Sequence, residues 1–128
     1  MAKTYSLEGT GSFKLTDSSS NVLINFSHLK DFSGLSPETV QYGDIKFSSI
    51  KVINLDPIAA RALLYVRNEN TVDGEGITVK IAGTPDITIS TLEPGEWMFV
   101  PVRTTADIKF DVNGPAGDRT AHYILIDA

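Results

Sequence analysis

Apolar and polar residues alternate with a period of two along several stretches of the chain, and this pattern restricts the fold more than any other feature. Successive side chains of a β-strand point to opposite faces, so each alternating stretch predicts a strand with one buried and one solvated face. The apolar positions of these stretches are Val22, Ile24 and Phe26; Ile77, Val79 and Ile81; Ile87 and Ile89; and Ile108, Phe110 and Val112. The chain is therefore expected to be all-β.

Turn-forming residues separate the expected strands. Residues 82–85 (Ala-Gly-Thr-Pro) divide two alternating stretches and predict a hairpin connection. Residues 73–76, 93–95 and 113–118 supply further glycines, prolines and Asx residues. Residues 57–61 have helical character, but they are too few to form a helical layer. This spacing of short strands and turns favours an antiparallel β-sandwich, which we expect to be jelly-roll-like.

The alternation changes phase once. Ile45 and Phe47 share one face of a strand, whereas Ile50 and Val52 have the opposite parity. One inserted residue reverses the faces taken by all the side chains that follow it. We therefore predict a β-bulge, or a bend at which the chain changes sheets, at residues 48–49.

Three segments are apolar on both faces, namely residues 62–66, 97–102 and 123–126. A strand of a monomeric sandwich needs only one buried face, and 128 residues leave little chain for a third layer. The second apolar faces are expected to be covered either by loops over central strands or by another subunit. Candidate interface positions on these segments and near the N-terminus are Tyr5, Leu7, Met98, Val100, Ile124 and Ile126.

Residues 1–44 differ in character from the rest of the chain. Residues 10–12 and 17–20 are glycine, serine, threonine and aspartate, and residues 31–44 contain few apolar anchors. We expect an extended N-terminal arm over residues 1–44, with one or two strands and a long loop, and a β-sandwich core over residues 45–128. The two parts are expected to make one domain, because 128 residues have room for one.

Composition and charge exclude several classes of protein. The chain has no cysteine, which excludes disulfide scaffolds, thiolate metal sites and thiol catalysis. Its formal net charge of −5 argues against a nucleic-acid binder, because such proteins normally present a basic surface. No apolar run approaches 18 residues, and residues 1–6 do not open a signal peptide, so we expect neither a membrane partner nor secretion.

No set of side chains has the spacing of a catalytic or cofactor-binding motif. His28 and His122 lie outside ligand motifs, and we expect both at the rim of the core or, for His122, at an interface. Residues 69–75 carry acidic and amide side chains around a glycine, but they lack the order of a calcium loop and fit a solvated turn. Nucleophile-elbow and phosphate-loop patterns are absent. We therefore expect no enzyme activity, no metal and no cofactor.

Aromatic residues raise the alternative of a carbohydrate-binding module, which would need flat rings lined up on one exposed face. Trp97 and Phe99 share a parity inside a doubly apolar strand, which favours the core over an exposed platform. Tyr5 and Tyr42 fall in the N-terminal region and are the remaining candidates for exposed rings. A calorimetric or glycan-array titration would separate this alternative from a structural role.

The order of motifs in the second half of the chain bears on which known proteins the chain resembles. It runs from Ala-Leu-Leu-Tyr-Val-Arg-Asn at residues 62–68, through a hairpin at 77–92 and a Leu-Glu-Pro-Gly-Glu corner at 92–96, to an apolar strand at 97–102 and a closing Tyr-Ile-Leu-Ile strand at 123–126. This order resembles that of small virion proteins of tailed bacteriophages. The resemblance covers residues 61–126, and the N-terminal part lies outside it.

The resemblance implies a non-enzymatic structural role on the virus particle. The expected role is that of a decoration or cement protein, made in the host cytoplasm, that bridges capsomers on the outer surface of the capsid. A component of the neck or tail is the other placement. The expected partners are the major capsid protein and further copies of the chain, in a trimer for example. The net negative charge agrees with an outer position, because packaged DNA would repel it.

Overall fold

The computed structural model describes residues 5–7, 13–16, 18–19, 22–26, 32–35, 40–53, 62–102 and 106–127. The chain divides into two compact units, Met1–Pro37 and Glu38–Ala128. This division falls ahead of the boundary expected at residue 44, because the strand that begins at Val40 is an integral part of the second unit.

The first unit contains four short strands, where one or two were expected. β1 (Tyr5–Leu7) pairs antiparallel with β4 (Phe32–Leu35), and β2 (Phe13–Thr16) pairs antiparallel with β3 (Val22–Phe26). Each pair forms its own two-stranded sheet. The strand expected from the alternation of residues 22–26 is confirmed.

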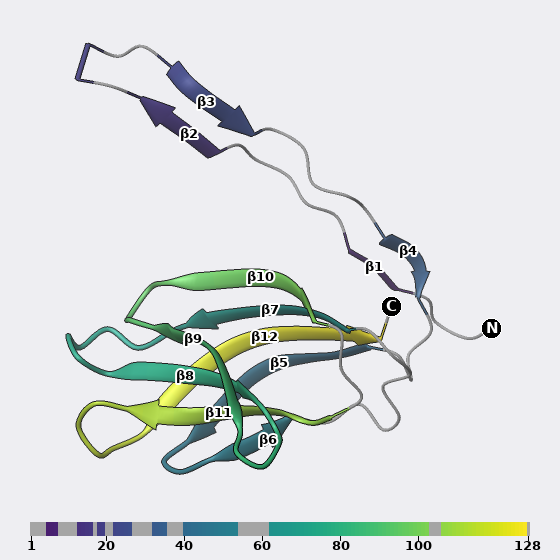
Figure 1. Cartoon of the computed structure of the whole chain (residues 1–128), viewed down its shortest axis with the longest axis vertical. Coiled ribbons are helices and arrows are strands. Elements are labelled where there is room, and N and C mark those ends of the chain that lie inside the picture. Colours follow the sequence, from purple (N-terminus) through teal and green to yellow (C-terminus); the bar gives the residue numbers. More distant parts are fainter. Residues whose placement is uncertain are drawn as a thin grey trace. The chain divides into compact units, whose positions relative to one another are not determined.

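The second unit is an antiparallel β-sandwich of two four-stranded sheets (Figure 1). Its strands are β5 (Val40–Phe47), β6 (Lys51–Ile53), β7 (Ala62–Asn68), β8 (Gly76–Ile81), β9 (Ile87–Leu92), β10 (Trp97–Val102), β11 (Ile108–Asn113) and β12 (Arg119–Asp127). Sheet I has the order β10-β7-β12-β5, and sheet II has the order β6-β11-β8-β9. This strand order is that of an eight-stranded jelly roll, which confirms the expected fold class.

Alternating side chains from both sheets fill the space between them. The buried core cluster consists of Phe47, Ile53, Leu64, Val66, Ile77, Val79, Leu92, Val102, Ile108, Phe110, Ala121, Tyr123 and Leu125. Phe110 of sheet II contacts sheet I through its ring, whose centroid lies 6.2 Å from that of Phe47 and 5.8 Å from that of Tyr123. The expectation that Ile87 is buried is wrong: it lies opposite Ile81, which packs against the core, but it begins the edge strand β9 and is 62% exposed.

The predicted bend between β5 and β6 is confirmed, although the faces assigned after it are not. β5 belongs to sheet I and β6 to sheet II, so the chain changes sheets at residues 48–50. A single inserted residue would return Ile50 and Val52 to the face of Ile45 and Phe47, but both are exposed. Ile53 is buried instead, because β6 pairs with β11 in the register that places Ile53 opposite the buried Ile108.

The expected turns lie between strands as predicted. Residues 82–86 connect the antiparallel pair β8 and β9, and residues 93–96 form a corner that carries the chain from sheet II to sheet I. The connection between β11 and β12 requires glycine at position 114, where φ is +87° and a Cβ atom would collide with the carbonyl oxygen of Gly74. Residues 57–61, expected to have helical character, lie outside the described residues.

One arginine is buried inside the sandwich. Arg119, at the start of β12, is 1% exposed, and its guanidinium donates to the carbonyl oxygens of Gly76 (2.9 Å), Asn113 (2.9 Å) and Pro115 (2.7 Å). A buried cation requires such partners, because burial removes its hydration. These bonds fasten the β11–β12 connection to the first residue of β8.

A buried asparagine fixes the loops at the same end of the sandwich. The side-chain amide of Asn68 donates to the carbonyl oxygens of Glu75 and Leu92, both at 2.9 Å, and its Oδ1 accepts from the backbone N–H of Asn70 at 2.9 Å. Asn68 itself is fully buried. Because side chains alternate along β7, this anchored inward residue leaves the neighbouring Arg67 side chain on the outer face of sheet I.

Candidate functional site

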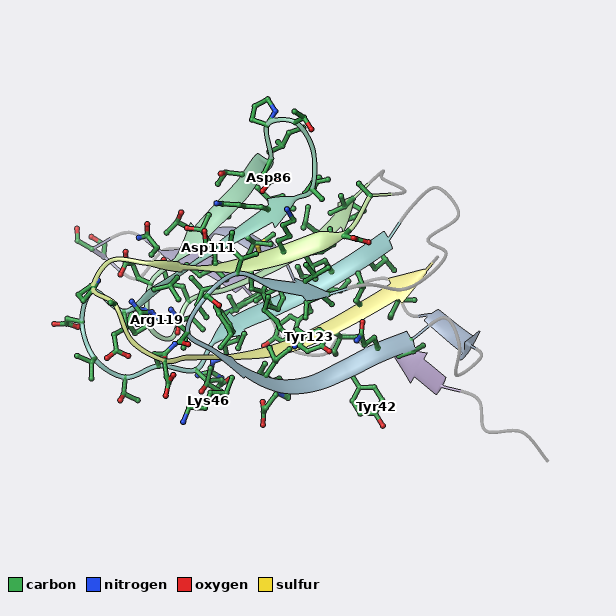
Figure 2. All side chains as sticks on the ribbon, turned by 90° about the horizontal axis from the view of Figure 1, so that it is seen from below. Tyr42, Lys46, Asp86, Asp111, Arg119 and Tyr123 are labelled. Carbon is green, nitrogen blue, oxygen red and sulfur yellow. The ribbon has the colours of Figure 1, made fainter. Side chains whose placement is uncertain are left out.

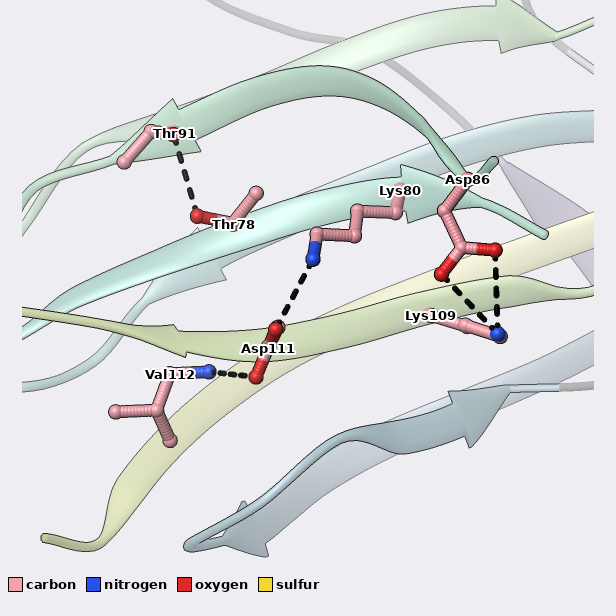
Figure 3. A network of polar contacts seen from close by, with 7 residues as sticks. All are labelled: Thr78, Lys80, Asp86, Thr91, Lys109, Asp111 and Val112. Carbon is pink, nitrogen blue, oxygen red and sulfur yellow. Dashed lines mark hydrogen bonds and ion pairs between the residues drawn. The ribbon is translucent and has the colours of Figure 1, made fainter. Parts of the chain in front are cut away.

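The two outer faces of the sandwich differ in chemistry. On sheet II most of the outward side chains are paired polar groups (Figure 3), with Val52 of β6, opposite Lys109, as an exposed apolar exception. Lys80 lies 3.0 Å from Asp111, Lys109 lies 3.2 Å from Asp86, and the hydroxyls of Thr78 and Thr91 lie 3.3 Å apart. Polar side chains that already have partners suit contact with water, so this face needs no protein cover.

Asp86 is the acidic group most affected by this network. The backbone N–H of Gly83 donates to its carboxylate, and the Lys109 ammonium donates as well. Both interactions, the amide first, hold the pKa of Asp86 below its ordinary value of 3.8. The carboxylate therefore contributes stability above that ordinary value, and the contribution is lost as the pH falls through the lower folded-state pKa.

We expect Asp86→Asn to weaken the dependence of unfolding free energy on pH in the acid range. The wild type loses the Asp86 contribution as the pH falls below about 4, whereas the variant has none to lose, so the two should converge in acid. Lys109→Met should remove only part of this pH dependence, because the hydrogen bond from the Gly83 backbone N–H to Asp86 remains. Urea titrations at several pH values measure the free energy of unfolding of each protein. An equal dependence of this free energy on pH in wild type and Asp86→Asn would contradict the stabilising role of the Asp86 carboxylate.

The outer face of sheet I is built from the three doubly apolar segments. These segments are β10, β7 and β12, which are adjacent in sheet I, with β5 completing it. The strand registers align their outward side chains in three rows across the sheet. The charged row is Trp97, Arg67, His122 and Asp44; the aromatic row is Phe99, Tyr65, Ile124 and Tyr42; and the aliphatic row is Pro101, Leu63, Ile126 and Val40. The second apolar faces therefore make one continuous surface.

Large aromatic side chains on this surface are exposed. Tyr42 is 61% exposed, Trp97 45% and Phe99 37%. Figure 2 shows Tyr42 and Lys46 projecting from β5 on one side of the sandwich, with Asp86 and Asp111 on the opposite side. Hence an aromatic outer face on sheet I opposes a polar outer face on sheet II.

The phase expected for β10 is wrong. Trp97 and Phe99 were expected in the core, whereas Met98 and Val100 were candidate interface residues. In the structure Met98 and Val100 pack against the core cluster, and Trp97 and Phe99 are exposed. Periodicity cannot choose a face when both are apolar, and the choice is made by pairing with β7, where Met98 lies opposite the buried Val66.

The other candidate interface residues differ from one another in burial and in position. Ile124 lies half-buried in the aromatic row. Ile126 is 1% exposed and Leu63 is 3% exposed, although both lie in the aliphatic row and outside the core cluster. Tyr5 and Leu7 belong to β1, and their side chains lie outside the described residues. The exposed part of the surface thus consists mainly of the aromatic and charged rows, together with Pro101 at the edge of the aliphatic row.

An open groove of about 480 Å³ lies along the charged row. It is lined by Asp44, Tyr65, Arg67, Glu69, Thr120 and His122. We call it the charged groove. His122 Nδ1 lies 2.6 Å from Asp44 Oδ1, and Arg67 Nε lies 3.5 Å from Glu69 Oε1. The groove therefore combines two carboxylates with one guanidinium and one imidazole, and each carboxylate lies beside a nitrogen group.

Aromatic rings border the charged groove. The ring centroid of Tyr65 lies 6.2 Å from that of Trp97, with the planes tilted by 37°, and 6.4 Å from that of His122 in an edge-on arrangement. Such offset and edge-on contacts are favourable and hold the rings in place. The groove thus offers hydrogen-bonding groups beside apolar ring surfaces.

Of the residues that line the charged groove, the sequence singled out His122, while Glu69 fell in an expected solvated turn and Tyr65 in a doubly apolar segment. His122 was expected at a rim or an interface, and it lies on the outer face; His28 lies outside the described residues. Asp44, Arg67 and Thr120 were not singled out, because each is an ordinary polar residue in its own strand. The available signal was a charged residue within or beside an otherwise apolar strand, and its meaning depends on the strand order.

The described part of the chain shows neither a cluster of metal-ligating side chains nor a membrane-spanning helix. Among the residues that the structure describes, no group of three or more His, Cys, Asp or Glu side chains is placed to hold a metal ion. The same residues include no helix with the length and apolar character needed to cross a membrane. Two of the residues compared above with a calcium loop lie in the loop after β7. There the Glu69 carboxylate pairs with Arg67, and the side-chain amide of Asn70 donates a hydrogen bond to Asn68 Oδ1.

Comparisons with known proteins add little. No protein-family model matches the chain, and no curated protein matches it either. Among solved structures it is similar to a mutant of CooA from Carboxydothermus hydrogenoformans, with 17% sequence identity and a TM-score of 0.36 over 64% of this chain. The match spans 47% of that protein, so this chain corresponds to about half its length. A similarity this slight carries no argument about function.

Proposed function

We propose that this chain is a non-enzymatic structural protein of a virus particle, and that it binds a protein shell through the outer face of sheet I. The observation that carries the proposal is the contrast between the two outer faces of one sandwich. Sheet II presents paired polar side chains, while sheet I presents exposed Tyr42, Trp97 and Phe99 in adjoining rows. Monomeric proteins rarely expose large contiguous apolar patches unless these bind something.

The chemistry of the face suits a protein partner. Interfaces are enriched in aromatic residues and arginine at their centre and carry polar groups at their rim. Here the aromatic row provides the aromatic residues, and the charged row beside it provides Arg67 together with the polar side chains of His122 and Asp44. A stable contact needs about 800 Å² on each partner, and a four-stranded sheet can offer a face of that order.

A flat binding face on a small domain suits reinforcement of a lattice. Many copies, each bound by one modest interface, resist separation of shell subunits more strongly than any single contact can. The formal net charge of −5 favours the outside of the shell, because packaged DNA repels it. The proposed role is therefore decoration or cement on the head, with further copies and the major capsid protein as partners.

The placement on a phage rests on the resemblance of residues 61–126 to small virion proteins, with neck or tail as the other position. Jelly rolls serve as viral capsid domains and as lectin domains. A fold alone does not set a function, so the binding face has to be tested directly.

We expect the double variant Phe99→Ser, Tyr42→Ser to lose binding to expanded shells of the phage that encodes the chain. Both side chains are exposed, so the sandwich should stay folded while the aromatic row loses its two exposed rings and keeps that of Tyr65. Co-sedimentation with the shells measures binding, and mass photometry measures self-association. The expected loss is at least tenfold in affinity, or about 1.4 kcal/mol or more.

Ile87→Ser is the matched control, because it also removes an exposed apolar side chain but from sheet II. It should bind shells as the wild type does. A wild-type protein that stays monomeric and leaves the shells unbound would refute the proposal. An equal loss in the control would show that the outer face of sheet I is not the binding surface.

A carbohydrate-binding module is the second candidate function, favoured by the exposed positions of Trp97 and Phe99. Their burial would have argued against it. Tyr42, Tyr65, Trp97 and Phe99 all lie on the outer face of sheet I, so aromatic rings gather on one face as this function requires.

A further inference from the structure

We infer that the charged groove, together with the ring of Trp97, is a binding site for a neutral sugar at the end of a glycan chain. This inference rests on the second candidate function, and the site shares Trp97, Arg67 and His122 with the proposed docking face. The groove volume of about 480 Å³ falls within the range of small-molecule sites. Its lining joins hydrogen-bonding groups to aromatic rings, and a sugar has the same two kinds of surface.

The charges of the groove select a neutral ligand. Asp44 and Glu69 would repel a phosphate or a carboxylate, and Arg67 would repel a cation. A hydroxyl group both donates and accepts, so neighbouring sugar hydroxyls can donate to a carboxylate and accept from a guanidinium. The Asp44–His122 and Arg67–Glu69 pairs place such a donor beside such an acceptor in two positions of the same groove.

The aromatic border supplies the apolar part of the contact. Trp97 is 45% exposed and lies next to Tyr65, with ring centroids 6.2 Å apart. A sugar ring has a face of C–H groups that can pack on an exposed aromatic ring while its hydroxyl edge reaches the polar groups. Trp97 also pairs across the sheet with Arg67, so one ligand can contact both.

Most of the site stands on paired strands, and Glu69, in the loop after β7, is held by the hydrogen bond that its backbone N–H donates to the Thr120 carbonyl oxygen. Trp97, Arg67, His122 and Asp44 come from four adjacent strands, whose hydrogen bonds set the spacing of their side chains. Behind them Asn68 bonds to Glu75 and Leu92 and holds β7 in place. Groups held on strands lose little conformational freedom when a ligand binds.

The test titrates the full chain, labelled with ¹⁵N, with neutral oligosaccharides that end in glucose, galactose, mannose or N-acetylglucosamine. Sialylated oligosaccharides and inorganic phosphate serve as anionic probes. We expect at least one neutral probe to shift the amide signals of Arg67, Glu69 and His122, while the anionic probes leave them unchanged. Shifts caused only by the anionic probes, or by none of the probes at millimolar concentration, would overturn the inference.

Variants locate the bound sugar. Trp97→Ala should weaken binding about tenfold or more, and Trp97→Phe should recover part of it because the ring is kept. Asp44→Asn should also weaken binding, whereas Ile87→Ser on sheet II should bind normally. Circular dichroism confirms that each variant is folded. Unchanged binding in Trp97→Ala and Asp44→Asn would exclude this groove.

The outcomes separate the site from the two functions. Sugar binding that shifts signals elsewhere would leave the second candidate function standing and remove this site. An absence of sugar binding together with intact shell binding would remove the second candidate function and leave the docking role. Shell binding is measured on the wild-type protein and on Asp44→Asn, because Trp97 also belongs to the proposed docking face and its removal would affect both functions.

Discussion

Replacing Arg119 with methionine should lower the free energy of unfolding by about 3–5 kcal/mol. The guanidinium makes three hydrogen bonds of 2.7–2.9 Å to main-chain carbonyl oxygens, and hydrogen bonds to a charged group contribute about 1.5–3 kcal/mol each. Removal of the cation also relieves its own desolvation cost, which offsets part of the loss. Methionine keeps much of the volume, so the remaining effect reports the orphaned carbonyl groups.

Arg67→Met is the matched control for this experiment. Arg67 lies on the neighbouring strand but points outward, and its ion pair with Glu69 is largely exposed to solvent. Such pairs contribute about 0–1 kcal/mol, so the control should stay within that range. Urea unfolding followed by circular dichroism measures both variants. A loss of less than about 1 kcal/mol in Arg119→Met would show that water replaces the arginine easily.

Phe110→Ala is expected to cost about 3–5 kcal/mol, as large-to-small substitutions of buried aromatic residues do. Phe110 is fully buried and its ring contacts Phe47 and Tyr123, which belong to the opposite sheet. The substitution therefore leaves a cavity at the contact between sheets, and the surrounding side chains can fill it only in part.

Phe99→Ala tests the same change of residue type on the outer face of sheet I. Phe99 is 37% exposed, so its truncation should cost about 1 kcal/mol or less. Thermal and urea unfolding of the two variants compare them directly. Equal losses of unfolding free energy would mean that the outer face of sheet I is already covered in the free protein. The proposed shell binding covers this face only in the complex. The pair of variants thus separates residues that hold the fold from residues that are free to bind.

The charged groove shows the limit of sequence reasoning most clearly. Asp44, Arg67 and His122 come from β5, β7 and β12, and each alone is a charged or polar residue on a strand. They form a row only because β12 lies between β5 and β7 in a particular register. Strand order depends on pairing between segments that are distant along the chain, and no local pattern encodes it.

The sequence by itself determined the kind of structure. Its period of two predicts the strands, its glycine and proline clusters predict the turns, and its change of phase predicts a bulge or a passage between sheets at residues 48–49. These features are local, because they follow from backbone geometry and from which side chains avoid water.

Only the tertiary structure decided which faces meet and which stay open. Segments 62–66, 97–102 and 123–126 have two apolar faces each. The burial of apolar side chains therefore does not decide which face of such a strand points into the core. Pairing with β7 turns Met98 inward and Trp97 outward, and the adjacency of β10, β7 and β12 joins three faces into one surface. The reason is physical: hydrogen bonds between strands fix the register, and the register then chooses the side on which each residue lies.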